Sequence, residues 1–146
     1  MKILVLNGPN LNMVGIREKG IYGTTSYEDI VKEIEDYAKE KNIEVECRQS
    51  NHEGDLVDWI QEAYFNKYDG IVINPGAYTH TSIALLDAVK AIDPIRVIEV
   101  HLSDINERED FRKISYISMA CKQQIKGLGS KGYLVAIENL INEETL

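Results

Sequence analysis

The chain has 146 residues, 44% of them hydrophobic and 27% charged, which suits a single domain over residues 1–146 and argues against a disordered chain. Its net charge of −8 disfavours nucleic acid and anionic membranes as main partners, because both are bound by clustered Lys and Arg. Cys47 and Cys121 lack metal-ligand spacing and no run suggests a signal peptide or membrane span, so we expect a reducing, cytoplasmic setting.

The first predicted strand is the unbroken apolar run at residues 3–6, which ends at Asn7. The loop that follows, residues 8–26, has no apolar periodicity, and loops of this length are usually functional lids or disordered. Ser26 and Asp29 have the spacing of a capping box. Apolar residues at helical spacing then predict a helix that ends near residue 42.

The middle of the chain contains two further predicted strands. Residues 43–47 alternate between apolar and polar, which is typical of an edge strand, and an amphipathic helix over residues 56–64 follows, with Trp59 expected in the core. The β-branched run at residues 70–73 has no alternation, so we expect a strand buried on both faces that ends at Asn74.

The last third of the chain is predicted to add two strands and two helices. Thr79, Thr81 or Ser82 could cap a helix that starts near residue 83 and ends before Asp93-Pro94. The remaining predicted elements are a strand at 95–100, a short helical connection at 104–111, a strand in the second half of 114–125 and a helix around 133–141.

Five strands alternating with helices predict a parallel α/β sheet with right-handed crossovers. For so short a chain, a flavodoxin-like, doubly wound, three-layer α/β/α arrangement is expected. In such sheets the ligand crevice lies outside the carboxyl ends of the strands.

Polar side chains follow three of these strands. Asn-Pro-Gly at residues 74–76 is also ordinary turn chemistry, but three polar strand ends at one edge of the sheet favour a site. The residues brought to that edge are Asn7 and Asn10 after the first strand, Asn74 after the central strand, and Glu99, His101 and Ser103 at the fourth.

The sequence lacks the motifs of several common kinds of active site. Glu99, His80 and His101 could in principle bind zinc, but no HExxH or comparable close pair is present. The segment GPNLNMVG lacks the Gly-Lys-Ser/Thr of a phosphate loop, and neither GxGxxG nor GxSxG occurs. Proton chemistry without a metal or cofactor remains.

Two residue pairs could carry this proton chemistry. Arg17 and Tyr22 share the first loop, and an arginine can stabilise a tyrosine phenolate as a general base. Equally, Tyr22 could pack at a turn and Arg17 could be a surface charge. Glu99 and His101 lie two apart on a predicted strand, hence on one face, which suits either a general acid with its orienting carboxylate or a structural histidine.

Seven motifs along nearly the whole chain resemble the type II 3-dehydroquinate dehydratase family. The resemblance implies a flavodoxin-like lyase that converts 3-dehydroquinate to 3-dehydroshikimate by anti elimination through an enolate, in the shikimate or quinate pathway. The motifs are NGPNLNMVGIRE, IYGTT, QSNHEG, INPGAYTHTS, EVHLS, REDFR and KGYLVAIENL, in that order.

The resemblance also implies catalytic roles. Tyr22 would remove the C2 proton with Arg17 holding its phenolate, and a water held in part by Asn10 would stabilise the enolate oxygen. His101 would protonate the leaving C1 hydroxyl, and Glu99 would orient His101. No metal or cofactor is implied.

The implied substrate-binding residues come from three parts of the chain. Asn74 and the backbone amides of Leu102 and Ser103 would bind the substrate carboxylate, while His80 and Arg112 would contact ring hydroxyls. Asp87 would reach the substrate of a neighbouring subunit, in a homo-oligomer that the family builds as a dodecamer of trimers.

The chain departs from the family pattern after Arg112. Ile114 occupies a position where many members carry histidine, and Met119–Gln124 is more polar than the small apolar run expected. These changes affect local packing or an interface rather than a proposed catalytic position. A non-catalytic module that binds a small carboxylate is the alternative, although such a binder would not need Tyr22, Arg17 and His101.

Overall fold

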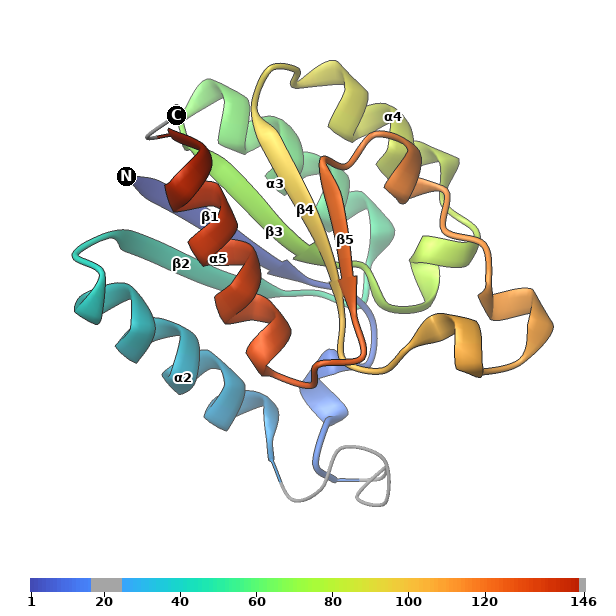
Figure 1. The fold of residues 1–146 in the computed structure, drawn as a ribbon. Helices are drawn as coiled ribbons and strands as arrows, with labels where there is room; N and C mark the ends of the chain where they lie inside the picture. The colour runs from blue at the N-terminus through green and yellow to red at the C-terminus, as the bar shows by residue number, and fades with distance from the viewer. Residues whose placement is uncertain (17–24, 145–146) are drawn as a thin grey trace.

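Within residues 1–16 and 25–144, which the computed structural model describes, five strands form one parallel sheet (Figure 1). The strand order is β2-β1-β3-β4-β5, which is the predicted flavodoxin-like order. All neighbouring strands pair in parallel. The strands are β1 (Lys2–Asn7), β2 (Glu44–Gln49), β3 (Gly70–Asn74), β4 (Arg96–His101) and β5 (Gln123–Lys126).

Helices cover both faces of this sheet, so the predicted three-layer arrangement is confirmed (Figure 1). Helices α2 (Tyr27–Glu40) and α5 (Lys131–Glu144) pack on one face, and α3 (Glu53–Phe65) and α4 (Ile83–Ala91) pack on the other. Along β1 the side chains alternate between the two cores: those of residues 3 and 5 face α2 and α5, and those of residues 4 and 6 face α3 and α4. This explains the non-alternating apolar runs.

Several local predictions hold in the structure. Ser26 and Asp29 form the capping box of α2, with both reciprocal hydrogen bonds at 3.1 Å. Of the three candidate caps for α4, Ser82 takes the role, since its hydroxyl accepts from the Leu85 N–H at 2.9 Å. Strand β2 lies at the edge of the sheet, as its alternating pattern predicted.

Two predictions hold only in part. Trp59 is half-buried: it packs against the core under α3 and α4, and the Arg48 guanidinium lies over its ring at 5.6 Å. The short helical connection predicted at residues 104–111 consists of two 3-10 turns, η3 (Ile105–Glu107) and η4 (Asp110–Arg112), and a third, η5 (Ile117–Met119), follows before β5. No continuous apolar stripe supports an α-helix there, since Ile105 and Ile117 are buried but Phe111, Ile114 and Met119 are exposed.

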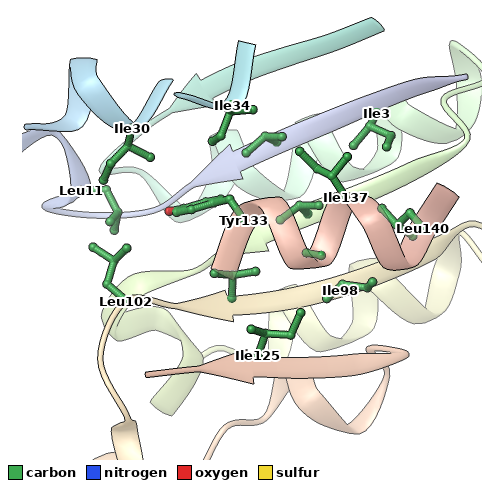
Figure 2. Packing of buried hydrophobic residues seen from close by; sticks show 14 of the residues in the cluster. Ile3, Leu11, Ile30, Ile34, Ile98, Leu102, Ile125, Tyr133, Ile137 and Leu140 are labelled. Carbon is green, nitrogen blue, oxygen red and sulfur yellow. The ribbon is translucent and has the colours of Figure 1, made fainter. Parts of the chain in front are cut away.

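Helix α5 begins at the carboxyl end of the sheet. Figure 2 shows it lying along the strands, with Ile137 and Leu140 packed on the sheet farther toward the strands' amino ends. In the same view Tyr133 directs its hydroxyl toward the end at which Leu11 and Leu102 lie. No helix in the described ranges is long and apolar enough to cross a membrane.

Candidate active site

A cavity of about 210 Å³ lies at the carboxyl ends of β1, β3 and β4, where the sequence predicted a site. It is smaller than the roughly 300–1,000 Å³ typical of sites for drug-sized ligands, so it suits a small molecule. Of the predicted site residues, the structure places Asn10, Asn74, His80, His101, Leu102, Ser103 and Arg112 in its lining.

Two glycines allow the loops after β1 and β3 to meet at this cavity. The Gly8 N–H donates to the Asn74 carbonyl at 2.8 Å, and a Cβ on Gly8 would lie 2.4 Å from the Pro75 carbonyl oxygen. Gly76 has a positive φ of 60°, and a Cβ there would lie 3.0 Å from the Pro9 carbonyl oxygen. Side chains at these positions would push the loops apart.

A buried tyrosine holds two asparagines at the floor of the site. The Tyr133 hydroxyl donates to Asn7 Oδ1 at 2.5 Å and accepts from Asn74 Nδ2 at 3.0 Å. Asn74 Oδ1 in turn accepts from the Gly76 N–H at 3.2 Å. Burial raises the pKa of Tyr133, which therefore stays a neutral donor. Asn74 is thus oriented at both ends of its amide, with one Nδ2 hydrogen left for a ligand.

The predicted pair of Glu99 and His101 is present and buried. His101 Nε2 hydrogen-bonds Glu99 Oε2, which also accepts from Thr79 Oγ1 at 3.0 Å, Ser115 Oγ at 2.8 Å and Gln124 Nε2 at 3.0 Å. Burial acts to raise the pKa of Glu99, but the hydrogen bond from His101, its charge, and the bonds from Gln124 and Ser115 outweigh it and lower that pKa. An anionic Glu99 accepts the Nε2 proton, so Nδ1 is the ring nitrogen left for a ligand.

Two basic side chains and a second histidine lie on another wall of the cavity. His80 Nδ1 lies 2.7 Å from the Ile114 carbonyl oxygen, which can only accept, so His80 Nδ1 donates. Arg112 Nε donates to Glu109 Oε2 at 2.6 Å. Arg108 also lines the cavity. Two guanidinium groups beside neutral donors suit an anionic, hydroxylated ligand.

Some predicted residues are not brought to the cavity. Glu99 lies behind His101, fully buried, and Asp87 lies on the exposed face of α4, outside the lining. Asn10 lines the cavity in a left-handed conformation, with its N–H donating to Asn51 Oδ1 at 3.0 Å. Arg17 and Tyr22 fall outside the described residues.

Sequence reasoning missed several supporting residues. Arg108 could have been suggested by its place one turn before Arg112, whereas Thr79 was considered only as a helix cap. The contacts of Ser115, Gln124 and Tyr133 gave no local signal, because their partners are distant in sequence. Among residues 1–16 and 25–144, no three His, Cys, Asp or Glu side chains are grouped so as to hold a metal ion.

Comparisons with known proteins agree over nearly the full length of the chain. A family model described as dehydroquinase class II matches residues 1–141. The 3-dehydroquinate dehydratase of Fusobacterium nucleatum is 60% identical over 143 residues, which is 97% of each chain. The crystal structure of the type II dehydroquinase from Butyrivibrio crossotus is 62% identical, covers 97% of each chain and superposes with a TM-score of 0.95. The type II dehydroquinase from Propionibacterium acnes is 42% identical, with a TM-score of 0.92 over 97% of this chain and 96% of that one.

Proposed function

The chain belongs to the class II dehydroquinase family and is a 3-dehydroquinate dehydratase; from this premise we propose how its residues carry out the reaction. The enzyme removes water from 3-dehydroquinate by anti elimination through an enolate and gives 3-dehydroshikimate. The reaction serves the shikimate or the quinate pathway.

Substrate binding uses the walls of the cavity. Asn74, whose amide is oriented by Tyr133 and by the Gly76 N–H, binds the substrate carboxylate together with the backbone amides of Leu102 and Ser103. His80 and Arg112 contact the ring hydroxyls. These groups hold the ring in a single orientation, which lowers the entropic part of the barrier.

Proton removal at C2 belongs to Tyr22, which acts as a phenolate stabilised by Arg17. The negative charge then moves to the ketone oxygen, where a water held in part by Asn10 donates to it. Such placed donors stabilise charge as it develops in the transition state.

Loss of the C1 hydroxyl belongs to His101. Its Nε2 is occupied by Glu99, so the proton delivered to the leaving hydroxyl comes from Nδ1. Glu99, anionic because its pKa is lowered, accepts the Nε2 hydrogen of His101 and sets the orientation of the ring. This buried pair beside a cavity is the observation that carries the proposal.

An absorbance assay tests the function directly. Purified protein mixed with 3-dehydroquinate should form the conjugated enone of 3-dehydroshikimate, which absorbs in the ultraviolet. The signal should persist with a metal chelator and after borohydride treatment, since the mechanism uses neither a metal nor a Schiff base. Well-folded protein that binds the substrate but forms no enone would instead be a binding module.

The role of Tyr22 needs its own test. Tyr22→Phe should lower kcat by about 10²-fold or more and change KM little, because a general base acts in the transition state. The matched control is Tyr37→Phe, which removes a hydroxyl from α2 outside the cavity lining. Equal losses in kcat and in substrate affinity would make Tyr22 a binding residue instead.

Residues 1–146 form one catalytic domain in this proposal, and several copies assemble into a dodecamer of trimers. Asp87 on the exposed face of α4 contacts the substrate of a neighbouring subunit. The two free cysteines, Cys47 and Cys121, fit a reducing cytoplasm, where we place the enzyme.

A further inference from the structure

A glutamine on the edge strand β5 contacts the carboxylate of the buried catalytic pair. We propose that Gln124 is a positioning residue for the dehydration: its amide keeps Glu99 oriented and charged, and through Glu99 it holds the His101 ring in the position from which it acts as the acid. The inference rests on the proposed role of His101 as the acid.

The register of the sheet brings Gln124 to Glu99. Strands β4 and β5 pair so that Gln124 lies directly opposite Glu99, and paired residues on neighbouring strands project to the same face. The Gln124 Nε2 donates to Glu99 Oε2 at 3.0 Å. The preceding residue, Gln123, faces the other side, where its Oε1 accepts from Asn139 at 2.8 Å.

The other groups that donate to Glu99 Oε2 do not always have a hydrogen available for it. Thr79 Oγ1 and Ser115 Oγ are 2.5 Å apart, so whenever one hydroxyl donates to the other, only one of the two protons points at Glu99. His101 loses and regains a proton during turnover. Among the described contacts of Glu99 Oε2, the Gln124 amide is therefore the donor that neither titrates nor takes part in a hydroxyl pair.

The surroundings of Glu99 explain why the Gln124 amide helps to keep the Glu99 carboxylate charged. Glu99 is fully buried, and its second oxygen, Oε1, has no hydrogen-bond partner in the described structure. The titratable groups that face it are His101 on its own strand and the Cys121 thiol from the segment before β5. Burial, together with the Glu99 charge, raises the pKa of Cys121, which stays neutral. The carboxylate thus depends on His101, the hydroxyl pair and Gln124.

Loss of the Gln124 N–H should let Glu99 take up a proton at higher pH. A protonated Glu99 has lost the negative charge that accepts the Nε2 hydrogen of His101 and orients its ring, so turnover falls on the acid side of the pH profile as Glu99 is protonated. Gln124 does not line the cavity formed by the described residues, so substrate affinity should stay the same.

The test compares two neighbouring glutamines in the full-length enzyme, after turnover of 3-dehydroquinate by the wild type is established. Gln124→Met and Gln124→Val remove the donor, and valine suits a strand if methionine disturbs folding. Gln123→Met is the matched control. We expect the acid limb of the kcat profile to move up by about one pH unit in both Gln124 variants. At pH values below the acid limbs of both wild type and variant, kcat should then be about tenfold lower in the variant, and KM should change by less than about twofold.

Three outcomes would overturn the assignment. They are acid limbs that superimpose on the wild type in folded Gln124 variants, the same shift in Gln123→Met, and a uniform loss at every pH with a raised KM. If the wild type does not dehydrate the substrate, the proposed function fails, and NMR titration of the His101 ring then tests the contact alone. The step in that titration that reports Glu99 should move up in Gln124→Met, and an unmoved step would refute the role.

Discussion

A single hydroxyl connects three secondary-structure elements at the floor of the site. Tyr133 on α5 donates to Asn7 at the end of β1 and accepts from Asn74 at the end of β3. Each partner is buried, so each needs a hydrogen bond that water cannot supply. The tyrosine therefore contributes to the stability of the floor and sets the orientation of the Asn74 amide, for which we propose contact with the substrate carboxylate.

Removing this hydroxyl should affect stability and binding together. Tyr133→Phe leaves Asn7 Oδ1 and one Asn74 Nδ2 hydrogen without partners, which should lower the free energy of unfolding by about 1–3 kcal/mol. KM should rise more than kcat falls, because the role proposed for Asn74 is to bind the substrate in its ground state. Denaturant unfolding and steady-state kinetics measure the two effects. An unchanged KM would show that Asn74 keeps its orientation without Tyr133.

The lowered pKa of Glu99 predicts how stability depends on pH. The folded protein binds this proton less readily than the unfolded chain, so Glu99 contributes stability above its ordinary pKa of 4.5 and loses it as pH falls through the lower folded value. The stability difference between wild type and Glu99→Gln should therefore shrink as the pH drops below about 4.5. Unfolding curves over an acid series measure it. A constant difference would mean that Glu99 is already protonated in the folded protein.

At the scale of single residues, the sequence indicates those that line the cavity better than those that support them from behind. The polar ends of β1, β3 and β4 pointed to Asn10, Asn74 and His101, because parallel strands share one carboxyl edge. Gln124 carried no such signal. Its partner Glu99 is 25 residues away, and the contact exists only because β5 pairs with β4 in one particular register.

Among the elements, α2 has the clearest local signal. Ser26 and Asp29 close its capping box directly after the loop that carries Arg17 and Tyr22. The box satisfies backbone N–H groups that the first turn of a helix leaves without partners. The start of α2 is therefore defined by these two side chains as well as by its packing on the sheet.

Loss of this cap should destabilise the protein without touching the cavity. Ser26→Ala should lower the free energy of unfolding by about 1 kcal/mol, as other capping serines do. Lys32→Ala on the same helix is the control and should have almost no effect, since its ion pair with Asp36 is exposed to solvent. Thermal or denaturant unfolding distinguishes them. A larger effect from Lys32→Ala would contradict the capping assignment.

Predictability differs between elements for a physical reason. Buried strands such as β1 and β3 can be predicted from the sequence because helices cover both faces of the sheet, and a strand covered on both faces needs a continuous apolar run. The individual 3-10 turns between β4 and β5 could not be predicted from the local sequence, because contacts with other parts of the chain hold them. The Tyr116 N–H, for example, donates to the Thr79 carbonyl at 2.9 Å. Trp59 was expected inside the core but is half-buried, because helical periodicity cannot show that an arginine covers its ring.

At the scale of the whole molecule, two large apolar side chains are exposed on neighbouring elements. Near the start of α4 and around η5, Ile83 is 56% exposed and Met119 is 67% exposed. Exposed apolar groups of this kind are typical of subunit interfaces. Asp87 lies on the exposed face of the same helix, which supports the proposal that assembly completes the site.

Mixed assemblies test whether Asp87 acts on a neighbouring subunit. Asp87→Ala and His101→Asn should each be poorly active alone, but refolding them together should restore activity, because some sites then combine an intact His101 with a neighbour's intact Asp87. Light scattering should give the same assembled mass for every mixture. Glu99→Gln mixed with His101→Asn is the control and should gain nothing, since both changes disable the same half of the site. No gain in the first mixture would place Asp87 outside the neighbouring site.

The hydrogen bonds of Tyr133 also determine when the floor of the pocket can form during synthesis of the chain. Its two partners lie on β1 and β3, whereas Tyr133 lies on α5, 126 residues beyond Asn7. The floor of the pocket can therefore close only after α5 has been synthesised and has left the ribosomal tunnel. Truncated chains that lack the helix should therefore be inactive even where their earlier strands have paired.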